Sequence, residues 1–277
     1  PLPQKYRELI ESCWSQNPKE RPTFEHIIHL LKTDPSYITD DIDKEEFQKY
    51  INIIDNSLIT FESSKRINHL EEYVNFKLHN FESYDVKFNR RNVFETEANN
   101  VSFDLESINI NSIEKQKLIQ KNKCFKFHQV LEKNTGQVYI SKQALFNPRT
   151  AILIDATNEM FSEINHKSIL KFIGYSCVDF KGRERPVIFT ENASNGSLYR
   201  ILEFEQINES KILDDTKKLI IIYGIASGMK YLHSKNIIHN NLNLFNIFLD
   251  EFLFPKIAGF NQYKINSENF FYNAPKF

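Results

Sequence analysis

Residues 228–261 read GMKYLHSKNIIHNNLNLFNIFLDEFLFPKIAGFN. The first seven of them continue a long apolar segment, and we predict a buried helix over about residues 214–234. Upstream lie short strand-like runs divided by the turn Asn134-Thr135-Gly136, and a second helix predicted over about 152–164. Strands that come first and helices that come later predict an α+β domain from about residue 112 onward.

The composition of the chain argues against several kinds of partner. Its 277 residues are 41% hydrophobic, enough to fill a core, and its net charge is −1 with a pI near 6.8. We therefore expect neither nucleic acid nor a membrane as a partner. Three scattered cysteines, Cys13, Cys124 and Cys177, favour buried thiols in a reducing compartment over a disulfide framework. No apolar run is long enough to cross a bilayer, and we expect a cytoplasmic protein.

The first 34 residues contain a helical pattern of apolar side chains at offsets of three, four and seven residues: Phe24, Ile27, Ile28 and Leu31. His26 and His29 lie three residues apart in the same pattern. Because no further ligand is near them in the sequence, we expect no metal there.

Residues 35–110 are rich in Asn, Glu, Asp, Lys and Ser. Within them Asp43 and Glu46 have the spacing of a helix N-cap and its reciprocal acid, which predicts a helix over 43–55. We interpret the rest of this region as a partly disordered linker.

From residue 137 onward, six short segments follow one another in the order found in protein kinases of the tyrosine-kinase-like type. They are VYISK (138–142), INHKSILKFIGY (164–175), IFTENASNGSL (188–198), GMKYLHSKNIIHNNLNLFNIFLD (228–250), PKIAGFN (255–261) and NAPK (273–276). The chain resembles this family from about residue 113 to its end. The resemblance implies a two-lobed fold, with an antiparallel β N-lobe and hinge over 111–193 and part of a helical C-lobe over 194–277. That C-lobe is expected to stop after the activation segment.

The start of the chain resembles the other end of the same family. LIESCWSQNPKERPTF (9–24) is similar to the last helices of a kinase C-lobe. The resemblance implies that residues 1–34 end a preceding kinase-like domain and that 35–110 link it to the second. We therefore expect residues 1–34 to be dispensable to residues 110–277.

The resemblance also assigns the site residues. Lys142 takes the place of the phosphate-anchoring lysine, Asn246 that of the second metal ligand, Thr190 that of the gatekeeper, and Glu191 to Ala193 that of the hinge. The positions that carry the chemistry are degenerate: Asn241 stands for the aspartate base, Gly259 for the metal-binding aspartate and Thr157 for the glutamate of helix C. The glycines of the phosphate loop are replaced by Gln120, Asn122 and Phe125. Larger residues line the expected adenine pocket: Phe127, Ile140 and Phe248.

A carboxamide has no basicity to take a proton near neutral pH, and glycine has no side-chain ligand. We therefore predict a catalytically inactive pseudokinase that needs no cofactor and acts by contact with a protein partner, for example a neighbouring kinase domain. The alternative is an active Ser/Thr or Tyr kinase that uses ATP and Mg²⁺ and recruits Asp250 or Glu251 as a substitute carboxylate. A decayed gene without function is the third reading.

Overall fold

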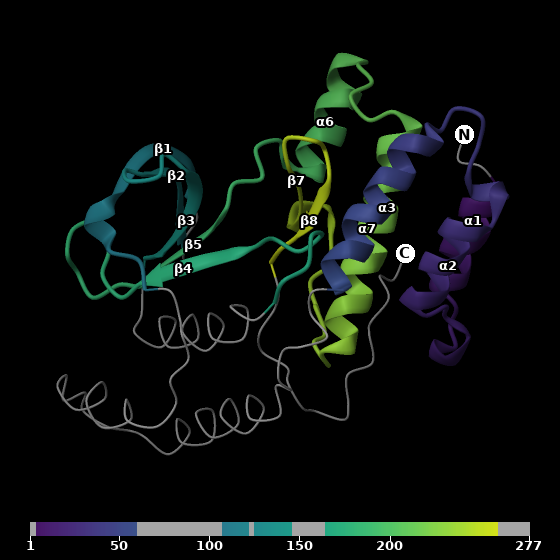
Figure 1. The fold of residues 1–277 in the computed structure, drawn as a ribbon, viewed down its shortest axis with the longest axis horizontal. Coiled ribbons are helices and arrows are strands. Elements are labelled where there is room, and N and C mark those ends of the chain that lie inside the picture. The colour runs from purple at the N-terminus through teal and green to yellow at the C-terminus, as the bar shows by residue number, and fades with distance from the viewer. Residues whose placement is uncertain (1–3, 60–106, 122–124, 146–163, 260–277) are drawn as a thin grey trace. The chain divides into compact units, whose positions relative to one another are not determined.

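The computed structural model describes residues 4–59, 107–121, 125–145 and 164–259, which fall into two compact units (Figure 1). We call Pro1–Glu62, Asn165–Leu170 and Ala193–Phe277 the helical unit, and Ser63–Ile164 and Lys171–Asn192 the sheet unit. Apart from Ile164, the helix predicted over 152–164 lies outside the described residues.

The sheet unit is built on one antiparallel sheet with the strand order β1-β2-β3-β5-β4. Its strands are β1 (Ile113–Lys121), β2 (Phe125–Glu132), β3 (Val138–Ala144), β4 (Phe172–Ser176) and β5 (Val187–Glu191). The predicted turn joins β2 to β3, and Gly136 in it has a φ of +71°, which residues with a side chain rarely adopt. In the resulting register Phe127 lies directly opposite Lys142.

The two faces of this sheet carry separate apolar clusters, because consecutive residues of a strand point to opposite faces. Val187 and Phe189 of β5 are fully buried in one cluster. Ile188 between them belongs to the other, where Phe125 and Phe172 pack against it.

The helical unit is centred on α7 (Asp215–Ser234), which confirms the long buried helix predicted from the sequence. Its N-cap is Asp214, whose side chain accepts a hydrogen bond from the Lys217 backbone N–H at 2.7 Å. Around it lie the other elements of the unit: α1 (Gln4–Cys13), α2 (Phe24–Thr33), α3 (Lys44–Ile59), α6 (Leu198–Asn208), the 3₁₀ helix η4 (Leu244–Asn246) and the strands β6 (Gly196–Ser197), β7 (Ile247–Leu249) and β8 (Pro255–Ile257). The three short strands pair in the order β6-β7-β8.

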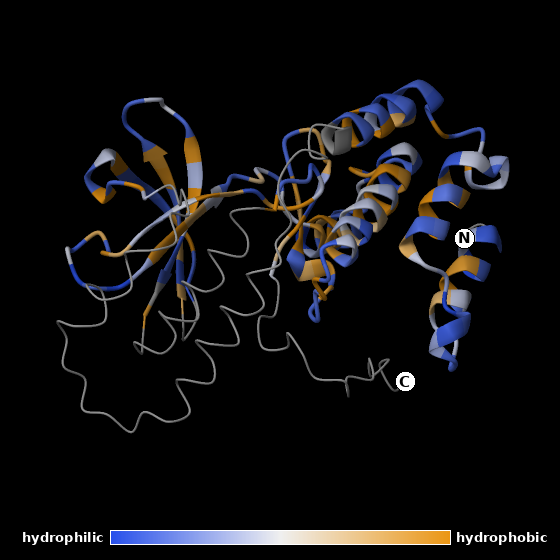
Figure 2. Ribbon diagram, turned by 60° about the horizontal axis from the view of Figure 1, so that its bottom comes forward, coloured by the Kyte–Doolittle hydropathy of each residue, from blue (hydrophilic) through white to orange (hydrophobic). Residues whose placement is uncertain are grey.

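The N-terminal helices share one hydrophobic core with α7. Figure 2 shows hydrophobic and hydrophilic residues on different sides of these helices, and the apolar sides meet. The core comprises Tyr6, Leu9, Ile27, Ile28, Leu31, Tyr37, Ile42, Phe47, Tyr50, Ile51 and Ile54 together with Leu219, Ile220, Tyr223 and Ala226 of α7. The expectation that residues 1–34 make no contribution to the second domain is therefore wrong. Sequence similarity to another domain's end says nothing about where an amphipathic helix buries its apolar face.

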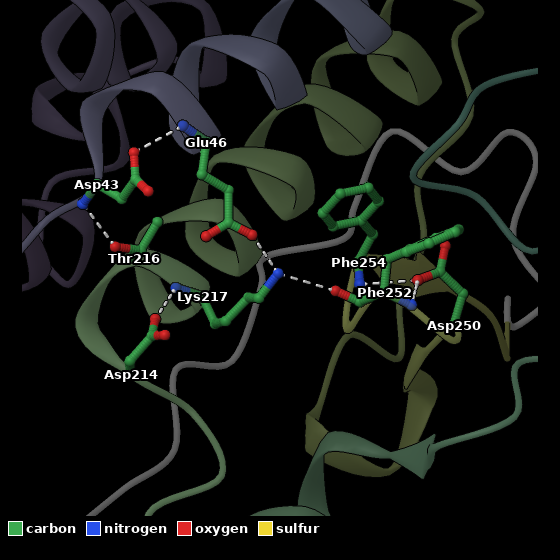
Figure 3. A network of polar contacts seen from close by, with 8 residues as sticks. All are labelled: Asp43, Glu46, Asp214, Thr216, Lys217, Asp250, Phe252 and Phe254. Carbon is green, nitrogen blue, oxygen red and sulfur yellow. Dashed lines mark hydrogen bonds and ion pairs between the residues drawn. The ribbon is translucent and has the colours of Figure 1, made fainter.

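A polar network adds to this packing (Figure 3). The Glu46 backbone N–H donates to Asp43 Oδ1 at 3.0 Å, so Asp43 is the predicted N-cap of α3. The reciprocal bond of a capping box is absent, because the Asp43 backbone N–H donates instead to Thr216 Oγ1 at 2.8 Å. The Glu46 carboxylate pairs with the ammonium of Lys217, which also donates to the Phe252 carbonyl oxygen at 3.2 Å. The helix predicted over 43–55 is thus part of a folded core rather than of a loose linker.

We expect the stability of the helical unit to fall as the pH is lowered from about 6.5 towards 4. Burial lowers the pKa of His166 to about 4, while its Nδ1 accepts a hydrogen bond from the Ser168 N–H at 3.1 Å. In the unfolded chain the imidazole has a pKa near 6.5, so the unfolded state binds more protons between these two values. The contribution is fully present above pH 6.5, and about 2–3 kcal/mol of it is lost by pH 4.

Urea unfolding at pH 7.5, 6 and 5 measures this dependence. In His166→Gln the free energy of unfolding should fall less steeply with decreasing pH. In His29→Gln, on the exposed side of α2, its pH dependence should be unchanged. An equally steep decline in His166→Gln would assign the acid sensitivity to other groups.

Candidate active site

The loop from His239 to Asn246 is anchored through the His239 ring. This side chain is almost fully buried, and its Nδ1 accepts a hydrogen bond from the Asn241 backbone N–H at 3.2 Å. The proton of the neutral ring is therefore on Nε2, which donates to the Ala258 carbonyl oxygen at 3.0 Å. Burial lowers the pKa of His239, and the ring stays neutral near pH 7. It thus ties the loop to the segment that follows β8.

Asn241, at the position expected for a base, forms hydrogen bonds through both the nitrogen and the oxygen of its carboxamide. Its Nδ2 donates to the Gly259 carbonyl oxygen at 3.2 Å, and its Oδ1 accepts from Asn243 Nδ2 at 3.0 Å. Asn246 Nδ2 donates to the Asn241 carbonyl oxygen at 2.8 Å. This network contains amides and backbone groups, none of which is a base at neutral pH.

Gly259, at the position expected for the metal-binding aspartate, packs directly against Asn246. It has a φ of +75°. A Cβ added at Gly259 would overlap Oδ1 and Cγ of Asn246 and lie 2.8 Å from its Nδ2. The Asn246 side chain therefore occupies the space that the side chain of an aspartate at 259 would need to enter.

The carboxylate of Asp250, the proposed substitute, forms its hydrogen bonds within a turn. Its Oδ1 accepts hydrogen bonds from the backbone N–H of Phe252 at 3.0 Å and of Phe254 at 2.9 Å, and its Oδ2 lies 4.0 Å from Lys256 Nζ. Burial raises the pKa of Asp250. These contacts describe a carboxylate that holds the β7–β8 turn together, whereas Glu251 is exposed at the same turn.

In the sheet unit, Lys142 lies on β3 with its Nζ 4.3 Å from the centre of the Phe125 ring. Phe125 is the residue that replaces the third glycine of the phosphate loop, so an aromatic ring contacts the ammonium group. No carboxylate of the described ranges 107–121, 125–145 and 164–192 forms an ion pair with Lys142. Burial lowers the pKa of Lys142. Thr157, at the position of its usual partner, lies outside the described residues.

Thr190 and Glu191 end strand β5, as the sequence predicts for the gatekeeper and the hinge. The Glu191 Oε1 accepts a hydrogen bond from the Lys171 backbone N–H at 2.8 Å, and the Ala193 carbonyl oxygen accepts from the Gly196 N–H at 3.1 Å. Of the adenine-pocket residues, Phe127 and Ile140 belong to the sheet unit and Phe248 to the helical unit. A filled pocket therefore stays a prediction.

The described part of the chain holds no group of three or more His, Cys, Asp or Glu side chains that could bind a metal, and no helix there is long and apolar enough to span a bilayer. Cys13 is half-buried and Cys177 is exposed, so the prediction of buried thiols is wrong for Cys177. Cys124 lies outside the described residues.

Residues 132–270, half of the chain, match the sequence profile of the family described as protein tyrosine and serine/threonine kinase. The chain belongs to this kinase family. The expected kinase fold is confirmed: the sheet unit is the antiparallel N-lobe, and the helical unit contains the helices of the C-lobe.

Several kinases are similar to the chain. Dual specificity protein kinase pyk3 of Dictyostelium discoideum is 26% identical over 263 residues, or 92% of this chain and 16% of its own length. Cysteine-rich receptor-like protein kinase 42 of Arabidopsis thaliana is 36% identical over 45% of the chain and 19% of its own length. Serine/threonine-protein kinase TNNI3K of Mus musculus is 37% identical over 36% of the chain and 11% of its own length. The chain thus spans less than a fifth of each of these relatives.

Kinases need a phosphate cradle, a lysine held by a glutamate, an aspartate on Mg²⁺ and an aspartate base. Of these parts, the described residues hold a counterpart of the lysine, Lys142, and Asn246 stands at the position expected for the second metal ligand. The residues present do not fit a magnesium-bound nucleotide, because the metal position is a glycine whose free space is filled by Asn246. Sequence reasoning found the missing side chains but not this packing, nor the ring of Phe125 over Lys142. The second could have been found, since the β2–β3 turn fixes Phe127 opposite Lys142 and places Phe125 two residues away on the same face.

Proposed function

We propose that this kinase-family domain is a pseudokinase that acts through contact with another protein, for example a neighbouring kinase domain. The observation that supports it best is the pair Gly259 and Asn246. A missing aspartate alone could be an isolated loss, but here a neighbouring side chain fills the vacated space. The amide network of Asn241 leaves the loop without a base as well.

The tandem arrangement belongs to the same proposal. The alignment with pyk3 covers 92% of the chain, so it extends beyond residues 132–270 into the N-terminal region that resembles the end of another kinase domain. We infer that residues 1–34 correspond to the end of a preceding kinase-like domain, although they pack in the core that α7 organises, and that the protein is cytoplasmic.

Purified protein should transfer no phosphoryl group from MgATP to itself or to generic peptides. Loss of the base or of the metal ligand each lowers kinase turnover by orders of magnitude, and both are absent here. Formation of ADP and incorporation of labelled phosphate measure the reaction. A signal that persists in Lys142→Met would come from a contaminating kinase. A signal that Lys142→Met abolishes would establish the active alternative.

A thermal-shift titration with ATP, with and without Mg²⁺, separates loss of chemistry from loss of binding. We expect no Mg²⁺-dependent stabilisation. A ligand raises the melting temperature only if it binds the folded state, and the metal position here has no side-chain ligand. A melting temperature that rises with MgATP but not with ATP alone would show a functional metal site.

A further inference from the structure

Among the described residues, strand β1 is an edge strand of the N-lobe sheet. It runs over nine residues, Ile113–Lys121, of which all but Ile113 are exposed. In the described residues β1 pairs with β2 on one side only, and β4 ends the sheet at the other edge. An edge strand presents unpaired backbone N–H and C=O groups, to which an extended peptide can add as a further strand.

This edge is strongly basic, although the chain as a whole is close to neutral. Residues 114–126 contain five lysines and a single acid, Glu114, whereas the net charge of the whole chain is −1. The lysines are Lys115, Lys117, Lys121, Lys123 and Lys126. Three of them, Lys115, Lys117 and Lys121, lie on β1, Lys126 lies on β2, and Lys123 lies outside the described residues.

The lysines of this hairpin are not neutralised within the described part of the domain. Lys121 lies directly opposite Lys126 in the strand ladder, an arrangement of like charges that destabilises a strand pair. Lys115 contacts the Phe180 ring, with Nζ 5.1 Å from its centre, and none of the four described lysines forms an ion pair with a described acid. Burial and the charges of Lys115 and Lys126 lower the pKa of His128. An anionic ligand along β1 would offset this repulsion.

Two apolar side chains interrupt the basic strand. Leu118 is 50% exposed and Ile119 is 42% exposed. Both side chains are therefore available to a peptide added to the edge. The register is irregular on both sides of Leu118, so this stretch differs from a uniform edge, and we assign neither side chain to a face of the sheet.

The same features select the kind of partner. Two copies of β1 paired with each other would bring the lysines of both strands together, which disfavours self-association. Nucleic acid would satisfy the lysines but not the unpaired backbone groups. We propose that the β1 edge binds an extended acidic peptide segment of a protein partner, with alternating acidic and apolar residues, as an added strand. This proposal rests on the interaction role proposed above, and peptide binding and phosphoryl transfer are measured separately, so that each can fail alone.

The test uses the full chain and a fluorescent acetyl-Thr-Glu-Val-Glu-Val-Glu-Val-Glu-Thr-amide peptide, with fluorescence anisotropy at low and at physiological salt. We expect saturable binding that weakens with salt. The same peptide N-methylated at every residue keeps its charge but has no backbone N–H left to donate along either edge, and it should bind at least about tenfold more weakly. Equal binding of both peptides, or binding of an oligonucleotide in place of the peptide, would overturn strand addition in favour of simple charge attraction.

The variant Lys115→Glu/Lys117→Glu/Lys121→Glu should lose affinity by at least about tenfold, because each change replaces an attraction to the peptide's glutamates with a repulsion. Lys19→Glu/Lys44→Glu/Lys49→Glu makes the same change in net charge at exposed positions of the helical unit and should bind like the unchanged protein. Absence of peptide binding by the folded unchanged chain would show that these lysines serve only to keep the edge from pairing. That result would leave the pseudokinase proposal untouched.

Discussion

Truncation of Leu31 to alanine should lower the free energy of unfolding of the helical unit by about 2–5 kcal/mol. Leu31 has no exposed surface and lies in the core that α1, α2 and α3 share with α7. Removal of its buried methyl groups leaves a cavity that this closely packed core can fill only in part. Ile54→Ala, at another fully buried position of the same core, should have an effect of similar size.

The readout must distinguish docking from the stability of the N-terminal helices alone. Hydrogen exchange of the α7 backbone amides does so, because α7 loses protection only if its cover is weakened. Ile53→Ala is the matched control, since Ile53 is the neighbour of Ile54 on α3 and is 41% exposed. If α7 kept its protection in Leu31→Ala and Ile54→Ala, the N-terminal helices would be independent of the second domain after all.

Gly259→Asp should destabilise the protein by about 2–4 kcal/mol and should not create a magnesium site. A non-glycine residue in left-handed backbone geometry costs about 1–3 kcal/mol, and the new Cβ also collides with Asn246. Asn246 cannot retreat freely, because its Nδ2 is hydrogen-bonded to the Asn241 carbonyl oxygen. Restoring the kinase residue therefore does not restore the kinase site.

Three further variants separate these contributions. Gly136→Ala places a Cβ at a φ of +71° with no atom within 4 Å, so it measures the backbone cost alone. Gly259→Ala has nearly the same backbone geometry plus the collision, and it should cost measurably more. Removal of the obstacle in Gly259→Asp/Asn246→Ala should recover part of the stability. MgATP-dependent stabilisation of the single variant Gly259→Asp would contradict this prediction. It would show that the Asn246 side chain moves aside and that the missing aspartate alone prevents metal binding.

Local sequence patterns were sufficient for much of the fold. The turn at residues 134–136, the long helix and the N-cap of α3 each depend on a few neighbouring residues, and each is found where predicted. The assignment of 241 and 259 as degenerate catalytic positions also depends on contiguous segments, and it stays a prediction. Family resemblance supplied the order of these segments, but it assigned the first 34 residues to another domain and so missed their docking.

What could not be predicted depends on contacts between distant residues. The capping box predicted from Asp43 and Glu46 is replaced by bonds to Thr216 and Lys217, more than 170 positions away. The packing of Asn246 into the space beside Gly259 likewise follows from the three-dimensional path of the loop. A pattern within one segment holds no information on such partners until the topology is known.

The shared core has a consequence for how the chain is made. The last of residues 4–59 is synthesised about 155 residues before the start of α7, the helix on which they pack. At typical elongation rates of 5–20 residues per second, their apolar faces wait roughly 10–30 s for α7. During that interval the nascent helices cannot bury Leu31 or Ile54 against their final neighbours, and a chaperone or a transient contact within the emerging chain has to shield them. Long sequence separation between contacting elements also slows folding after release. The N-terminal helices are thus translated first, whereas the central helix α7, on which they pack, is translated much later.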